Sequence, residues 1–126
     1  MCQFSVESLN SITGEIIKAA FEVSNNLGTG FLEKIYERDL LFELKDSGLK
    51  AISQVSIPVK YKDENIGNYM ADILVEDNVL VELKCVKQLN NIHVAQCINY
   101  LAATNLRLCL LINFQKTKLE WKRIVG

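Results

Sequence analysis

The sequence lacks the features that would place the protein in a membrane or outside the cell. It contains neither a signal peptide nor a run of about twenty apolar residues, which argues against secretion and membrane insertion. The four cysteines form no Cys-x-x-Cys pair, and three of them lie within apolar runs. Buried, reduced thiols suit the cytoplasm, and we therefore expect a cytoplasmic protein.

Excess basic charge and linkers are also missing. The net charge is −1 and the sequence pI is 5.8, so the chain has no general basic footprint for avid nucleic-acid binding. Basic residues late in the chain are candidates for a local basic rim: Lys84, Lys87, Lys116, Lys118, Lys122 and Arg123. No repeats, low-complexity segments or linkers occur, and 49% of the residues are hydrophobic. We therefore expect one domain, residues 1–126, with a single core.

Hydrophobic periodicity predicts a mixed α/β architecture. Helical spacing predicts helices over about residues 8–26, 32–46 and 92–104, the last of them capped by Asn90 and Asn91. Strand patterns cover residues 52–61, the segments around Asp72 and Glu82, residues 107–114 and a short edge strand at 119–125. Pro58 assigns its strand to an edge or a bulge. The apolar runs around Asp72 and Glu82 indicate a central sheet covered by helices.

Three ionisable residues interrupt these central runs. Asp72, Glu82 and Lys84 lie in two apolar segments joined by an acidic turn. An ionised carboxylate buried without a partner costs several kcal/mol, so a fold keeps one only if it pairs, protonates or binds a cation. We therefore interpret the three residues as a site.

The geometry of this site depends on the turn between the two strands. Side chains alternate between faces along a strand, so Glu82 and Lys84 share a face. A three-residue loop at 76–78 would place Asp72 directly opposite Glu82. A two-residue turn at 77–78 would put the two carboxylates on opposite faces of the sheet.

The residue types indicate metal-assisted phosphoester chemistry. Two close carboxylates repel each other unless a proton or cation lies between them, and Mg²⁺ takes oxygen ligands. A nearby lysine could balance the second carboxylate, orient a water molecule or stabilise charge on a phosphate. The structural alternative is an ion pair between Asp72 and Lys84, with Glu82 protonated or hydrogen-bonded to the backbone.

Asp72 followed by Glu82-Leu83-Lys84 resembles the signature of the PD-(D/E)XK nuclease superfamily. In that signature an acid precedes Glu-x-Lys by about ten residues, and Ala71 stands where the superfamily name has proline. Residues 96–100 are similar to the Gln-x-x-x-Tyr element of its exonuclease-like branch. Residues 30–36 resemble the motif that names the GxxExxY protein family.

The resemblance implies a restriction-endonuclease-like αβββαβ core, with a mixed central sheet flanked by helices and an extra N-terminal helix. It also implies Mg²⁺ or Mn²⁺ as cofactor and hydrolysis of phosphodiester bonds, with DNA as the expected nucleic-acid partner. Asp72, Glu82 and the backbone carbonyl of Leu83 are the implied metal ligands. Glu33 would complete the acidic shell, and Lys84 would position and activate water.

Further residues have two interpretations each. Gln96 and Tyr100 lie four apart on one helix face, either orienting Lys84 or the phosphate, or forming an ordinary helix edge. Tyr36 faces the same way as Glu33 and is either a substrate-positioning residue or a core aromatic. His93 is a capping or surface residue, with general base as its alternative role.

Two other functional classes stay open. One is a catalytically silent interaction module that keeps the nuclease fold, and the other is a hydrolase of a different phosphoester. A homodimer or a partner protein is expected if so small a domain is to grip a duplex.

Overall fold

The computed structural model describes residues 6–126 of the protein, and side chains from residue 7 onward. The elements in chain order are α1 (Val6–Leu27), α2 (Glu33–Asp46), β1 (Ala51–Tyr61), β2 (Glu64–Val75), β3 (Val79–Lys84), α3 (Asn91–Thr104), β4 (Leu108–Asn113) and β5 (Glu120–Val125). This order confirms the predicted αβββαβ core, which runs from α2 to β4 with α1 as the extra helix. Within residues 6–126, no helix is both long enough and apolar enough to cross a membrane.

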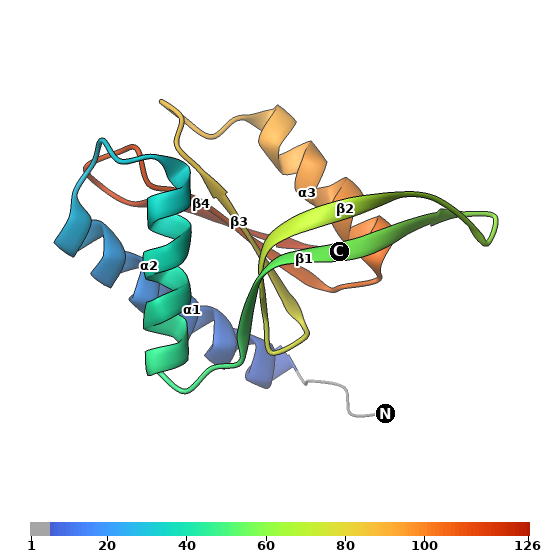
Figure 1. Cartoon of the computed structure of the whole chain (residues 1–126), viewed down its shortest axis with the longest axis horizontal. Helices are drawn as coiled ribbons and strands as arrows, with labels where there is room; N and C mark the ends of the chain where they lie inside the picture. The colour runs from blue at the N-terminus through green and yellow to red at the C-terminus, as the bar shows by residue number, and fades with distance from the viewer. Residues whose placement is uncertain (1–5) are drawn as a thin grey trace.

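The five strands form one mixed sheet in the order β1-β2-β3-β4-β5. β3 and β4 run parallel, with α3 as their crossover connection, and the other neighbouring strands run antiparallel. α1 and α2 cover one face of the sheet and α3 covers the other (Figure 1). β3 is buried along its length up to Lys84, because helices cover both of its faces. The fold is thus a restriction-endonuclease-like α/β fold.

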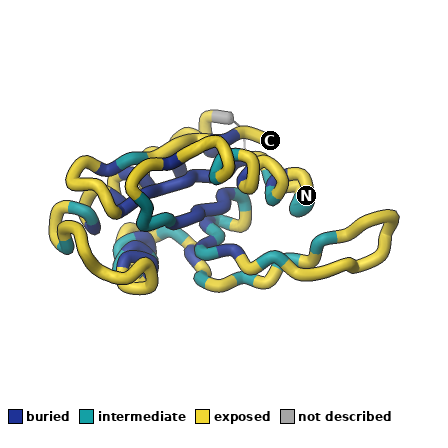
Figure 2. Tube along the Cα trace, turned by 90° about the horizontal axis from the view of Figure 1, so that it is seen from above, coloured by how far each residue is buried: buried dark blue, intermediate teal, exposed yellow. Residues whose placement is uncertain are grey.

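Two apolar clusters pack on the two faces of the sheet. Alternation along β4 sends Leu110 toward α1 and α2 and sends Leu111 toward α3. Figure 2 shows the buried segments gathered in the middle of the molecule. Cys97 and Cys109 belong to the α3 cluster and are free thiols, as expected from their apolar surroundings.

The β1–β2 hairpin extends beyond the rest of the sheet. β1 and β2 pair from Ala51 to Tyr61, whereas β2 pairs with β3 only over residues 73–75. The tip of the hairpin, residues 60–68, is exposed throughout and projects away from the helices (Figures 1 and 2). Nearer the sheet, Tyr69 and Ala71 pack on the side of α3. We call the point where β2 leaves β3 the fork. β1 is an edge strand, as Pro58 predicts.

The turn between β2 and β3 has the three-residue form, one of the two alternatives that the sequence left open. Val75 pairs with Val79, and the Asn78 N–H donates to the Val75 carbonyl over 3.0 Å. Glu76 and Asp77 adopt left-handed conformations with φ of 52° and 57°. This register places Asp72 opposite Glu82, one position beyond the last paired residues and therefore at the fork.

Candidate active site

Asp72 and Glu82 are each held by the backbone of the opposite strand. Oδ2 of Asp72 accepts a hydrogen bond from the Leu83 N–H over 2.9 Å, and Oε1 of Glu82 accepts one from the Asp72 N–H over 3.4 Å. These bonds take the place of ladder hydrogen bonds where the strands separate. Both carboxylates are therefore fixed at the fork by elements that the apolar core holds rigid.

Side chains change faces at the fork. Ala71 packs in the α3 cluster and Ile73 in the α1 and α2 cluster, although regular alternation would place both on one face. Opposite Asp72 in β1, Gln54 has a φ of 54°, which is uncommon for a non-glycine residue. Its side-chain amide donates to Glu37 Oε1 over 2.6 Å. Asp72 and Gln54 both face α2 as a result.

Glu82 is a buried carboxyl whose charge the site makes costly. Only 7% of the residue is exposed. Burial, followed by the charge of Asp72, raises the pKa of Glu82 to about 7, although the Tyr69 hydroxyl and the Asp72 N–H donate to it and favour the ionised form. A proton or a cation is needed to neutralise this pair of carboxyls.

Lys84 supplies positive charge to the same region. Its ammonium lowers the pKa of Asp72, Glu82 and Glu33, opposing the effect of burial on all three. The Lys84 carbonyl accepts a hydrogen bond from the Phe114 N–H over 3.0 Å, which anchors the end of β3 to the end of β4. The lysine is therefore close enough to act on all three carboxyls.

Acidic residues of α2 lie on the other side of Asp72. Glu33, the first residue of α2, lines a pocket of about 150 Å³ together with Glu37 and Asp72. Burial and the charge of Asp72 raise the pKa of Glu33. Glu37 is buried and forms an ion pair of 3.2 Å with Lys34. The predicted approach of Glu33 to the strand carrying Asp72 is thus present.

The predicted helix and core residues have distinct surroundings. Tyr100 stacks on Tyr69 with ring centroids 3.7 Å apart, and Tyr69 in turn donates to Glu82, so Tyr100 contacts the site through Tyr69. Gln96 is exposed on α3, and its role in orienting Lys84 or the phosphate stays a prediction. His93 accepts from the Asn90 N–H in a capping box, as expected for a capping residue. Tyr36 is fully buried, which supports the core interpretation over direct contact with substrate.

Several residues of the site were missed by the sequence analysis. Tyr69 bonds Glu82, which lies 13 residues away in the sequence, and Gln54 bonds Glu37, which lies 17 residues away. No local sequence pattern therefore marks either residue. Asn113 is fully buried, and its side chain bonds both the N–H and the carbonyl of the Val86 backbone, fixing the chain just after Lys84. A polar residue at the end of an otherwise apolar strand was the available signal for Asn113.

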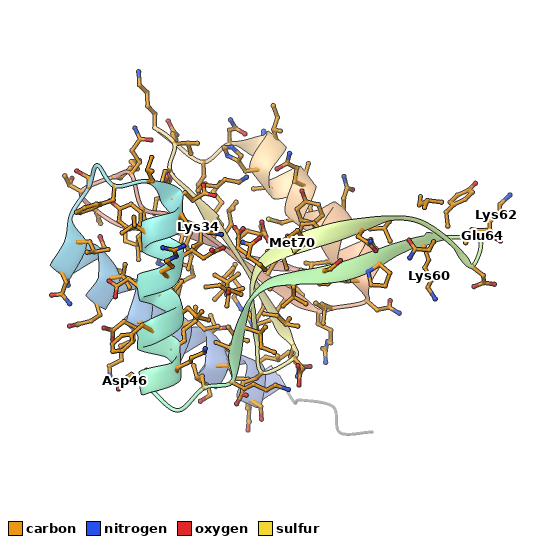
Figure 3. All side chains as sticks on the ribbon, viewed as in Figure 1. Lys34, Asp46, Lys60, Lys62, Glu64 and Met70 are labelled. Atoms are coloured by element: carbon orange, nitrogen blue, oxygen red, sulfur yellow. The ribbon has the colours of Figure 1, made fainter. Side chains whose placement is uncertain are left out.

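The late basic residues line different depressions, and a basic rim around the site stays a prediction. Lys87 and Lys122 line an open depression of about 690 Å³ beside the start of α3. Lys116 and Lys118 line a separate one of about 360 Å³. Arg123 follows Lys122 in β5 and faces the opposite side, where it donates to a side chain of α1. Two further lysines, Lys60 and Lys62, lie at the far tip of the hairpin (Figure 3).

The donors at the fork fit a hard divalent cation. Within residues 6–126, no three histidine, cysteine, aspartate or glutamate side chains converge as a metal cluster. Mg²⁺, however, is usually bound by one or two carboxylates with several waters retained. The Asp72 and Glu82 pair meets that requirement, since burial and then the charge of Asp72 raise the pKa of Glu82.

The fold and the acidic fork together define a restriction-endonuclease-like α/β protein with two carboxyls and a lysine where its sheet opens. The sequence profile of the PD-(D/E)XK nuclease superfamily matches residues 10–124. The chain belongs to this superfamily. No curated protein sequence matches it significantly.

Solved structures show the same fold at low sequence identity. The crystal structure of SSO0001 superposes with a TM-score of 0.58 and 16% identity, covering 74% of this chain and 49% of that one. LHK-Exo in complex with dAMP gives a TM-score of 0.51 and 14% identity, covering 84% of this chain and 75% of that one. A further crystal structure, of the alkaline exonuclease LHK-Exo from Laribacter hongkongensis, gives a TM-score of 0.45 and 14% identity, covering 98% of this chain and 72% of that one. The chain spans about half of the length of SSO0001.

Proposed function

We propose that the protein is a divalent-metal-dependent nuclease that hydrolyses phosphodiester bonds in DNA, with Mg²⁺ or Mn²⁺ as cofactor. The observation that carries this proposal is the pair of carboxyls of Asp72 and Glu82 at the fork, with Lys84 beside them. The dAMP bound to LHK-Exo, a deoxynucleotide, favours DNA as the substrate class. The segment 30–36 further supports membership of the GxxExxY family within the superfamily.

Asp72 and Glu82 would hold the metal through the carboxyl oxygens that the protein does not use elsewhere. Oδ2 of Asp72 and Oε1 of Glu82 accept the hydrogen bonds described above, so Oδ1 and Oε2 are the proposed ligand atoms. The Leu83 carbonyl points to the same side of β3 as the Leu83 N–H, toward Asp72, and would be the third ligand. Glu33 would complete the shell through a metal-bound water.

A bound divalent ion would supply charge stabilisation at the phosphate and lower the pKa of a coordinated water. Lys84 would hold the attacking water and stabilise negative charge that develops on the phosphate. Tyr69 keeps the Glu82 carboxyl in its orientation by donating to it, and Tyr100 keeps Tyr69 in place by stacking. Gln96, on the same helix as Tyr100, is the proposed group for orienting Lys84 or the phosphate.

The decisive experiment compares cleavage by wild type and Glu82→Gln. Labelled single-stranded, duplex and forked DNA, and matching RNA, would be incubated with each protein in Mg²⁺, Mn²⁺ or EDTA. Glu64→Gln, at the exposed tip of the hairpin, is the matched control for loss of one carboxylate. We expect metal-dependent cleavage of DNA by wild type and by Glu64→Gln, and none by Glu82→Gln.

Two results would contradict the proposal. Cleavage that persists in Glu82→Gln would come from a contaminant or another site. No cleavage by wild type, with Mg²⁺ binding still measured by calorimetry, would favour the catalytically silent module. That second class draws support from the backbone hydrogen bonds of both carboxyls, which also stabilise the fork structurally.

A further inference from the structure

The hydroxyl group of Tyr36 holds the loop that precedes α2. Tyr36 is fully buried, yet its hydroxyl donates to the Gly28 carbonyl over 2.7 Å and accepts from the Phe31 N–H over 3.3 Å. Gly28 and Phe31 lie near the two ends of the connection between α1 and α2. The hydroxyl of Tyr36, a residue of α2, therefore joins the beginning and the end of the preceding loop.

The hydroxyl bridge adds to the few hydrogen bonds that the loop makes with the adjoining helices, from the Gly28 N–H to the Ser24 carbonyl and from the Ile35 N–H to the Leu32 carbonyl, each over 2.9 Å. Gly28 and Gly30 have φ values of 70° and 104°, which L side chains rarely adopt. The N-cap of α2 is Leu32, which has no side-chain acceptor for the first helical N–H groups, the part usually taken by Ser, Thr, Asp or Asn. The Tyr36 hydroxyl does not cap these N–H groups, but it ties the helix to the loop at Gly28 and Phe31.

The ring of Tyr36 ties the same loop to the strand that carries Lys84. Tyr36 stacks on Phe114 with ring centroids 5.0 Å apart and an interplanar angle of 8°. The Phe114 N–H donates to the Lys84 carbonyl over 3.0 Å. The start of α2 is thus connected to the end of β3 through two aromatic rings and one backbone hydrogen bond.

Glu33 is the residue that this arrangement places. It is the first residue of α2, directly after the loop, and it lines the pocket shared with Asp72. Figure 3 shows its neighbour Lys34 at the opposite end of α2 from Asp46, the helix end beside the loop. A rotation or shift of the loop would therefore move the Glu33 carboxyl relative to Asp72.

We infer that Tyr36 is a positioning residue: its hydroxyl fixes the loop at 28–32 and thereby holds the Glu33 carboxyl toward the metal site at Asp72. This inference rests on the proposed function, in which Glu33 reaches the metal through water. It assigns a separate part to each of the three residues that define the motif at 30–36. Gly30 allows the positive φ that the loop requires, Glu33 supplies the carboxylate, and the Tyr36 hydroxyl fixes the loop and with it the position of Glu33.

The test is a double-mutant cycle on Mg²⁺ affinity, measured by calorimetry on the full-length protein without substrate. Tyr36→Phe keeps the stacked ring and removes only the hydroxyl. Loss of a residue that orients a metal ligand typically weakens metal binding by 10- to 100-fold, and we expect about tenfold for Tyr36→Phe. Glu33→Gln should weaken binding comparably, and the double variant no further than Glu33→Gln alone.

Matched variants separate positioning from general loss of structure. Tyr61→Phe, at the exposed tip of the hairpin, should leave the affinity unchanged. Gly30→Ala is a second route to the same defect, because its added Cβ meets no atom within 4 Å but its φ of 104° becomes strained. It should weaken Mg²⁺ binding even if Tyr36→Phe failed to fold, and again only while Glu33 is present.

Each outcome bears on the inference. Wild-type affinity in Tyr36→Phe, or an equal loss with and without Glu33, would overturn the positioning role while leaving the proposed function intact. Absence of Mg²⁺ binding by wild type would overturn both proposals together. A normal affinity in Glu33→Gln would remove the metal role of Glu33, and with it the basis for a positioning role of Tyr36.

Discussion

Glu82 combines deep burial with a carboxyl neighbour, and this combination makes stability depend on pH. Its pKa is about 7 in the folded protein and 4.5 as the ordinary value. As pH rises from about 4.5 to 7, the unfolded chain has already released the proton that the folded protein still binds, so stability falls through this window. The full loss amounts to about 3 kcal/mol above pH 7.

We therefore expect Glu82→Gln to be more stable than wild type above pH 7 when metal is removed with EDTA. The amide oxygen of the substituted side chain would keep both hydrogen bonds, because Tyr69 and the Asp72 N–H both donate to Oε1. Urea denaturation at pH 5 and pH 8 measures the effect. The two proteins should be nearly equal at pH 5, and equal stability at pH 8 would show that Glu82 ionises normally.

Lys84 is the predicted catalytic residue that acts on the water and the phosphate, whereas Asp72, Glu82 and Glu33 are predicted to act on the metal. Lys84→Ala should lower cleavage by about a hundredfold or more, the usual cost of removing a group that stabilises charge in the transition state. Mg²⁺ affinity should not fall, because the carboxyls remain. The assay is single-turnover cleavage, with Lys18→Ala, an exposed lysine of α1, as the matched control. An unchanged rate in Lys84→Ala would remove this mechanism.

The residues that interrupt apolar strands were predictable, because a charged group in a buried run requires an explanation. Asp72, Glu82 and Lys84 were found in this way, and Glu33 through the resemblance alone. Tyr69 and Gln54 were not, since their partners lie far along the chain and their types are common in strands. Tyr36 was singled out as a substrate-positioning or core residue, but the sequence did not indicate that its hydroxyl bonds the loop before α2.

Among the elements, α3 offers the sharpest local test. The Asn90 side chain accepts hydrogen bonds from the Ile92 and His93 N–H groups over 2.9 and 3.3 Å. Removing an N-cap acceptor typically costs about 1 kcal/mol, so Asn90→Ala should lower the free energy of unfolding by that amount. Asn91→Ala, one residue inside the helix, is the control. Equal losses in both variants, measured by urea denaturation, would contradict the cap assignment.

Element boundaries were predictable because their signals are local. Apolar spacing, Asn90 and the glycines after α1 and α2 mark the helices, and the acidic loop at 76–78 marks the turn. The fork was not predictable, because it depends on which strands pair. Residues 64–72 of β2 lie beyond the last partner in β3, and within the described sheet their ladder pairing is with β1 only.

At the scale of the whole molecule, charge sets the conditions for binding DNA. The net charge is −1, acidic side chains gather at the fork, and four of the late lysines line two other depressions. DNA phosphates approaching the fork are therefore repelled unless a cation is bound. We expect Mg²⁺ to strengthen DNA binding by Lys84→Ala, a variant suited to binding measurements because its cleavage should be slow.

The salt dependence of that binding follows from the number of phosphates contacted. Lys87 and Lys122 share one depression, and about two such contacts predict roughly a tenfold loss of affinity between 50 and 200 mM salt. A protein with six to ten contacts would lose about 10³ to 10⁵. Fluorescence anisotropy with labelled DNA, with and without EDTA, measures both effects. Strong binding in EDTA with a steep salt slope would point to a basic surface elsewhere, such as one formed across a homodimer.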